Sequence, residues 1–134
     1  MGRIEWMKEL GWNDDYLDEI RNVGYSYIRQ GKYDVALPFF ESLVVLDHNN
    51  AYDAQTLGAL YLQINEAQKA IIYLDRALQL ETDHAPTLLN LTKAFFAVGK
   101  ITDGIRLAKI LKNDHNPLIA STASALLLAY GGNK

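Results

Sequence analysis

The chain has 134 residues, a net charge of −3 and no cysteine, which suits one globular domain. Without cysteine there can be no disulfide, Cys-ligated zinc, iron–sulfur cluster or thiol nucleophile, and we expect a cytoplasmic location. With 13 Lys and Arg against 16 Asp and Glu and no basic run, the composition argues against nucleic acid as a partner.

The N-terminal segment carries charged residues among large apolar ones. Its spacing predicts a short amphipathic helix or arm over residues 1–12, followed by a helix start at Asn13-Asp14-Asp15. The apolar residues of this segment are Ile4, Trp6, Met7, Leu10 and Trp12. Because the longest apolar run of the chain, 123–130, is far shorter than the roughly 20 residues of a membrane helix, we expect no membrane span and no secretory signal.

The middle of the chain repeats itself every 34 residues. A small residue followed three positions later by an aromatic ring recurs as Gly24 with Tyr27, Gly58 with Tyr61, and Thr92 with Phe95. Other columns keep the same step, including Val23, Leu57 and Leu91, and also Ala36, Ala70 and Gly104. This periodicity divides the chain into units over 17–50, 51–84 and 85–118.

Each unit has the pattern of two amphipathic helices joined by a tight turn. Apolar residues recur at spacings of three and four, and the small columns allow two helices to approach closely. Gly31, Asn65 and Gly99 stand where the first helix of each unit should end, and these residue types suit a left-handed cap. The sequence therefore predicts short antiparallel hairpins.

A further helix is predicted after the last unit. It starts at Pro117 and runs to Tyr130, before Gly131-Gly132, and it would cap the exposed end of the stack. The consecutive leucines at 126–128 point to more than one side of a helix. A homodimer formed through this helix or through the N-terminal arm is therefore an open alternative.

The sequence offers little catalytic chemistry. His48, His84 and His115 all fall in turns between units, without the spacing that places two metal ligands on one helical face. No serine has the context of a nucleophile, and no glycine pattern would cradle a phosphate. We therefore predict that the protein is not an enzyme and has neither a metal site nor a cofactor.

The length of the period and the order of small and aromatic columns resemble the tetratricopeptide (TPR) repeat. The resemblance implies an all-α fold with three tandem TPR hairpins in a right-handed α-solenoid. It divides a single domain, 1–134, into an N-terminal arm (1–16), three repeats (17–50, 51–84, 85–118) and a capping helix with tail (119–134).

In TPR proteins the first helices of the repeats line a concave groove, so the resemblance also implies a binding surface for a protein or peptide partner. The residues that it places in this groove are Arg21, Tyr25, Ile28, Arg29, Tyr52, Ala59, Leu62, Leu89, Lys93 and Phe96. Ile28, Leu62 and Phe96 recur at one column and would form an apolar line. Burial of some groove residues by the N-terminal arm or by a neighbouring helix is an equal alternative.

TPR proteins that hold the carboxy-terminal peptides of heat-shock chaperones use a clamp of Lys and Asn. The corresponding positions here are Arg21, Tyr25, Thr56, Pro86 and Asn90. Since only the first of these is basic, we do not predict that clamp. An apolar groove suits an extended segment that inserts hydrophobic side chains.

A narrower resemblance links the first two units to bacterial type III secretion chaperones that hold translocator proteins. It rests on Gln30-Gly31-Lys32-Tyr33, Leu46-Asp47-His48 and Leu57-Gly58-Ala59, and it implies a chaperone that binds an extended segment of its client. The alternative is a structural adaptor subunit that docks into a larger assembly through its convex face or its C-terminal helix.

Overall fold

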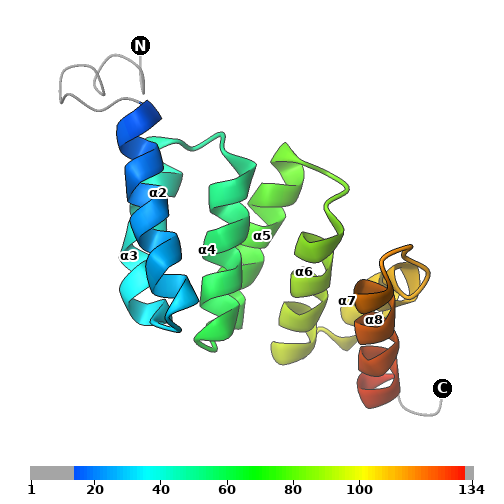
Figure 1. Cartoon of the computed structure of the whole chain (residues 1–134). Helices are drawn as coiled ribbons and strands as arrows, with labels where there is room; N and C mark the ends of the chain where they lie inside the picture. Colours follow the sequence, from blue (N-terminus) through cyan, green and yellow to red (C-terminus); the bar gives the residue numbers. More distant parts are fainter. Residues whose placement is uncertain (1–13, 132–134) are drawn as a thin grey trace.

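A computed structural model describes residues 14–131, and this part of the chain is helical with no strand. The helices follow one another in chain order (Figure 1): α2 Asp14–Arg29, α3 Tyr33–Leu46, α4 Ala51–Gln63, α5 Ala67–Leu80, α6 Ala85–Ala97, α7 Ile101–Leu111 and α8 Pro117–Tyr130. The all-α prediction is confirmed. None of these helices is both long enough and apolar enough to cross a bilayer.

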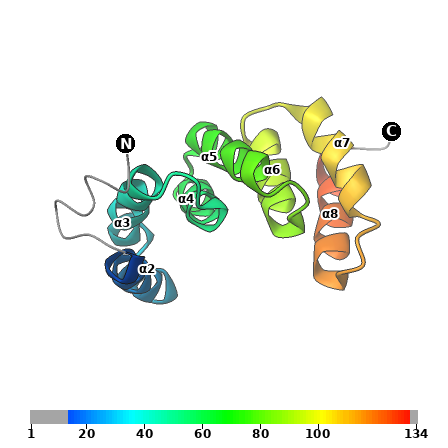
Figure 2. The same ribbon diagram turned by 90° about the horizontal axis from the view of Figure 1, so that it is seen from above.

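The helices pair into hairpins that stack side by side. Helix α2 packs on α3, α4 on α5, and α6 on α7, while α8 packs against α7 and α6. Seen from above (Figure 2), α2, α4, α6 and α8 follow one side of the molecule, and α3, α5 and α7 follow the other. This arrangement is a helical solenoid in which each hairpin contacts its neighbours along the chain.

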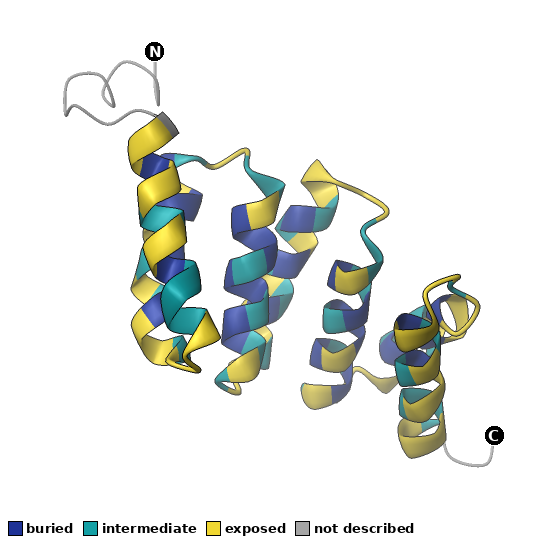
Figure 3. Ribbon diagram, viewed as in Figure 1, coloured by how far each residue is buried: buried dark blue, intermediate teal, exposed yellow. Residues whose placement is uncertain are grey.

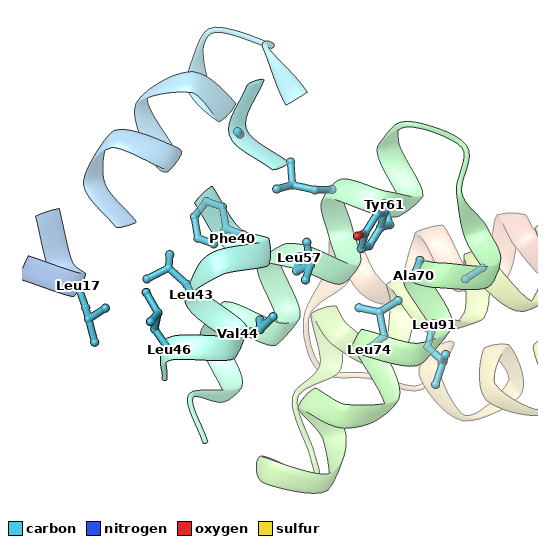
Figure 4. Packing of buried hydrophobic residues seen from close by; sticks show 13 residues of the cluster. Leu17, Phe40, Leu43, Val44, Leu46, Leu57, Tyr61, Ala70, Leu74 and Leu91 are labelled. Atoms are coloured by element: carbon cyan, nitrogen blue, oxygen red, sulfur yellow. The ribbon is translucent and has the colours of Figure 1, made fainter. Parts of the chain in front are cut away.

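The main core runs through the first two hairpins and into the third (Figure 4). Phe40, Leu43, Leu57 and Leu74 are fully buried there. The small residues that recur in the repeat lie where the two helices of a hairpin come closest to each other. A Cβ added to Gly58 would lie 2.6 Å from Cγ of Leu74, so this glycine lets α4 and α5 pack closely.

The turn predictions are confirmed by the backbone. Gly31 and Gly99 have φ values of 75° and 85°, and Asn65 has a φ of 67°. In each turn the following residue donates its N–H to a carbonyl five residues earlier, with distances of 2.8–2.9 Å. This bond ends a helix at a left-handed residue and explains why glycine or asparagine stands there.

Helix α8 continues the repeat pattern. Tyr130 stands 34 residues after Phe96, and α8 extends the row of first helices (Figure 2). It begins at Pro117, because Asn116 accepts a hydrogen bond from the N–H of Leu118 at 3.0 Å and Pro117 suits the first helical position.

The two predicted helix starts at the ends of the repeat region are confirmed, because α2 begins at Asp14 and α8 begins at Pro117. The predicted arm over residues 1–12 lies outside the described residues.

Candidate functional site

A hollow of about 300 Å³ opens between α2 and α4. Its lining combines apolar side chains with a few polar ones: Tyr25, Ile28, Tyr33, Thr56, Ala59, Leu60 and Gln63. Ligand pockets usually have volumes of about 300–1,000 Å³, so this one has room for one or two side chains and is small for a cofactor.

Tyr25 is held in the hollow by neighbouring rings and one hydrogen bond. Its ring lies 5.0 Å from that of Phe40 and 5.9 Å from that of Tyr52, measured between centroids. Its hydroxyl lies 3.2 Å from Oγ1 of Thr56. Since Thr56 donates its only hydroxyl proton to the carbonyl of Tyr52 at 2.9 Å, Tyr25 is the donor in the shared bond.

This arrangement leaves the two hydroxyl groups satisfied within the protein. Burial raises the pKa of Tyr25 to about 12, so its hydroxyl stays protonated at neutral pH. The hollow therefore offers mainly apolar surface. Gln63 is an exposed residue of the lining, and its side-chain amide can both donate and accept hydrogen bonds.

The guanidinium of Arg21 is bound by three carboxylates and is not available to a ligand. It donates to both carboxylate oxygens of Asp53, at 2.8 and 2.7 Å. It also donates to Asp47 at 2.6 Å and to Asp18 at 2.7 Å. The side chain of Asp53 is fully buried, and that of Arg21 is 12% exposed.

The network gives Arg21 a structural role that joins α2 to α4 and to the turn before it. Its hydrogen bond to Asp53 raises the pKa of the guanidinium, which is charged at any physiological pH. Burial raises the pKa of the Asp53 carboxyl, and the bonds from Arg21 oppose that effect. Because its charge is already matched by these carboxylates, Arg21 offers no unpaired cation to a ligand in the groove, where the resemblance to TPR proteins placed it.

Two residues that the resemblance placed in the groove are buried, with Phe96 4% exposed and Leu89 8% exposed. This burial corresponds to the alternative in which a neighbouring helix covers part of the groove. The Phe96 ring fills the space above Gly104, where a Cβ would lie 2.6 Å from Cε1 of the ring. Tyr130 stacks on its other side with centroids 4.3 Å apart. Phe96 is therefore buried because Gly104 of α7 leaves space for its ring and Tyr130 of α8 stacks on it.

The other predicted residues divide into three groups. Tyr25, Ile28 and Ala59 meet in the hollow, and Tyr52 stands beside them with 61% exposure. Arg29 and Lys93 are exposed, while Leu62 is half-buried against the main core. Figure 3 shows how exposed and buried residues alternate along α4 and α6. The expected apolar line is thus interrupted at α6.

Tyr33 and Leu60 also line the hollow, although the sequence did not indicate them as groove residues. Thr56 and Gln63 stand at columns that the resemblance to TPR proteins places in the groove. Tyr33 begins α3 directly after the Gly31 turn, and its place in the hollow depends on the angle between two helices.

Other hollows lie on the first hairpin. One of about 410 Å³ is lined by Pro38, Glu41, Ser42, Val45 and Leu46, and one of about 290 Å³ is lined by Ile20, Pro38, Phe39, Ser42 and Leu46. Between residues 14 and 131, no group of three His, Asp or Glu side chains is placed to hold a metal ion.

Residues 55–84 match the family model of the tetratricopeptide repeat. No curated protein matches the sequence. Among solved structures, the fold is similar to PcrH, a Pseudomonas aeruginosa protein, in complex with the chaperone-binding region of PopD. The TM-score is 0.78 at 21% identity, over 90% of this chain and 95% of that chain.

Two other structures are similar over most of their length. The Yersinia enterocolitica type III secretion translocator chaperone SycD gives a TM-score of 0.75 at 20% identity, over 96% of this chain and 98% of that one. The second TPR domain of human RPAP3, in complex with an HSP70 peptide, gives 0.72 at 18% identity, over 81% and 91%. The resemblance to TPR proteins and the helical solenoid fold are thereby confirmed.

Proposed function

We propose that the protein is a non-catalytic module that binds an extended segment of a partner protein along α2 and α4. The observation that carries this proposal is the hollow lined by Tyr25, Ile28 and Ala59. Its apolar surface and its volume of about 300 Å³ suit one aliphatic or aromatic side chain.

The chemistry of the lining favours an extended peptide over a small polar ligand. Successive side chains of an extended segment point to opposite sides, so one can enter the hollow while the backbone lies at its edge. The Gln63 amide is exposed there and can bond to that backbone. The charge of Arg21 is matched by three carboxylates, which disfavours a partner recognised through a terminal carboxylate.

The similar solved structures support the same proposal, because PcrH, SycD and an RPAP3 domain have each been solved with a peptide or region of a partner protein. At a finer level, we propose that the protein is a type III secretion translocator chaperone. The similarity to PcrH and SycD extends over nearly the whole of both chains, and the client segment would then belong to a translocator.

The peptide proposal can be tested with a matched pair of variants. Linear peptides are selected on the wild-type chain from a displayed library, and their affinities are measured by fluorescence polarisation. Ala59→Phe places a ring in the hollow, and Gln68→Phe places the same ring on the exposed side of α5. Excluding one large apolar side chain removes about 1.5–3 kcal/mol, so affinity should fall about tenfold or more.

Gln68→Phe should bind like the wild type, and circular dichroism should show that both variants are folded. Equal binding by Ala59→Phe, or selection of no peptide at all, would contradict the proposal. The finer proposal is tested by co-expression with a translocator from the same organism. The translocator should stay soluble with the wild type and precipitate with Ala59→Phe.

A further inference from the structure

The first hairpin exposes a side that the later hairpins bury. Val23 of α2 is 45% exposed, whereas Leu57 and Leu91, which stand one and two periods later, are 0% and 6% exposed. Those two leucines lie on α4 and α6, which pack on α3 and α5 of the hairpin before them. Because α2 is the first helix of the described residues, the first hairpin has no such neighbour within 14–131. Its uncovered side, which carries Val23, is the end face of the solenoid.

Helix α5 shows which side of a second helix faces the preceding hairpin. The guanidinium of Arg76 donates to the carbonyl of Val44 at 3.3 Å and to that of His48 at 2.9 Å. Both carbonyls belong to the preceding unit. Ser42 stands one period before Arg76, on α3. The repeat therefore places Ser42 on the end face, where a preceding unit would pack.

The hollow of about 290 Å³ on the first hairpin opens at this end face. Its lining includes Ser42 and is otherwise apolar: Ile20, Pro38, Phe39 and Leu46. Ala54, one period after Ile20, is 1% exposed, so the same position is covered in the second hairpin. The Ser42 hydroxyl donates to the Pro38 carbonyl at 3.0 Å, so an apolar side chain can enter the hollow without leaving that hydroxyl unpaired.

The segment that precedes α2 has the apolar side chains to cover this face. Trp6 and Leu10 stand four residues apart, so a helix would place them on one side. Gly11 and Asn13, directly before α2, are residue types that favour a turn and so allow the chain to reverse direction. The large apolar residues of the segment are Ile4, Trp6, Met7, Leu10 and Trp12.

The end face is within reach of this segment. Ile20 stands six residues after Asp14, which corresponds to about 9 Å along α2. The four residues from Leu10 to Asp14 span up to about 14 Å when extended. Leu10 can therefore lie beside the hollow, and Trp6, which is further from α2 in the sequence, can enter it. A segment tethered this closely has a high effective concentration at the face, which favours it over a separate chain.

We propose that residues 1–12 fold back onto the end face of their own chain, with Trp6 in the hollow beside Ser42 and Leu10 next to it. The segment then covers the first hairpin as a preceding hairpin would, and it closes the N-terminal end of the solenoid. The hollow of the end face shares no lining residue with the hollow between α2 and α4, so the proposed peptide site stays open.

The test uses the fluorescence of Trp6 in the full chain. The chain has two tryptophans, so Trp12→Phe leaves Trp6 as the only one. Its emission should lie at shorter wavelength than that of N-acetyltryptophanamide, and acrylamide should quench it several-fold less. Ser42→Lys in this background places an ammonium group in the hollow, so emission and quenching should approach those of the free compound.

Ser124→Lys is the matched control. Ser124, like Ser42, is an exposed helical serine whose hydroxyl donates at 3.0 Å to the carbonyl four residues earlier, but it lies on α8. This variant should leave the emission of Trp6 unchanged. Circular dichroism of each variant shows whether the fold is retained.

Urea denaturation followed by circular dichroism gives a second, independent measurement. Ser42→Lys should lower the midpoint in the wild-type chain. It should have little effect in a chain that carries Trp6→Gln/Leu10→Gln, because the contact that it disrupts is already lost. Additive effects of the two changes would overturn the proposal.

Three fluorescence results would also overturn it. The first is a Trp6 that is quenched as strongly as the free compound. The second is emission that shifts with protein concentration, since the segment would then bind a second copy. The third is emission that responds to Ala59→Phe and not to Ser42→Lys, since the segment would then lie between α2 and α4.

Discussion

Removing Arg21 should destabilise the fold more than removing Asp53, the carboxylate to which it donates two hydrogen bonds. In Arg21→Met the apolar stem remains, but the Asp53 carboxylate, which is fully buried, loses both of its bonds to the guanidinium. Leaving a buried charge unpaired typically costs 3–5 kcal/mol. Because Asp53 can take up a proton when Arg21 is lost, we expect a loss of about 3 kcal/mol near neutral pH.

Removing Asp53 instead of Arg21 should reduce the free energy of unfolding by less. In Asp53→Ala the guanidinium keeps its bonds to Asp47 and Asp18, and it is partly exposed to water. The loss is then closer to that of ordinary buried hydrogen bonds, about 1–2 kcal/mol.

The two substitutions should also differ in their dependence on pH. In Arg21→Met the folded-state pKa of Asp53 lies above its unfolded value of about 4. The folded variant then binds a proton that the unfolded chain has released, so its stability rises as the pH falls toward the unfolded value. The deficit relative to the wild type should shrink between neutral pH and about pH 5.

Urea denaturation followed by circular dichroism measures both differences at each pH. An Asp53→Ala variant that is less stable than Arg21→Met would refute this account of the network. So would an Arg21→Met deficit that stays constant with pH, because it would mean that the loss arises from packing rather than from an unpaired charge.

Three further predictions concern packing and titration. Gly58→Ala should destabilise the fold by about 1–3 kcal/mol, because the added Cβ would lie 2.6 Å from Leu74; a thermal melt unchanged from wild type would contradict this. Phe96→Ala should cost about 3 kcal/mol and release Tyr130, with which its ring stacks; tyrosine fluorescence and urea denaturation measure the two effects. Since burial raises the pKa of Tyr25 to about 12, the folded protein keeps this proton after unfolded tyrosine has lost it, so stability should fall as the pH rises above about 10. In an alkaline absorbance titration, the Tyr25→Phe variant should lack one of the phenolates that form at the highest pH. Loss of a phenolate that forms at lower pH would contradict the assignment.

Most of the fold could be predicted from the repeat pattern, because residues at the same column make the same kind of contact in every hairpin. The turn residues Gly31, Asn65 and Gly99 could be placed from sequence, since their left-handed backbone favours those residue types. The small residue at position 58 likewise marked the contact between α4 and α5. Both features depend on residues of a single hairpin, so they could be predicted from one sequence.

The candidate site was harder to predict, because it depends on contacts between repeats. Phe96 shares a column with Ile28, yet Gly104 and Tyr130 draw it into the interior, and neither belongs to its own helix. Arg21 stands at a groove column, but the fold brings Asp47 and Asp53 to it and pairs its charge. Column position thus predicts which side of a helix a residue occupies, whereas neighbouring hairpins decide whether it stays accessible.

Within residues 14–131, most of the buried apolar residues form two clusters, and this division has a consequence for local unfolding. The larger cluster joins α2, α3, α4 and α5 to α6, whereas Leu89, Leu111, Ile119 and Ala123 form a smaller one at the C-terminal end. Cooperative units of a solenoid follow such boundaries. We therefore expect the end formed by α7 and α8 to open more often than α2 and α4, so amide protons at the two ends of the molecule should exchange with solvent on different timescales.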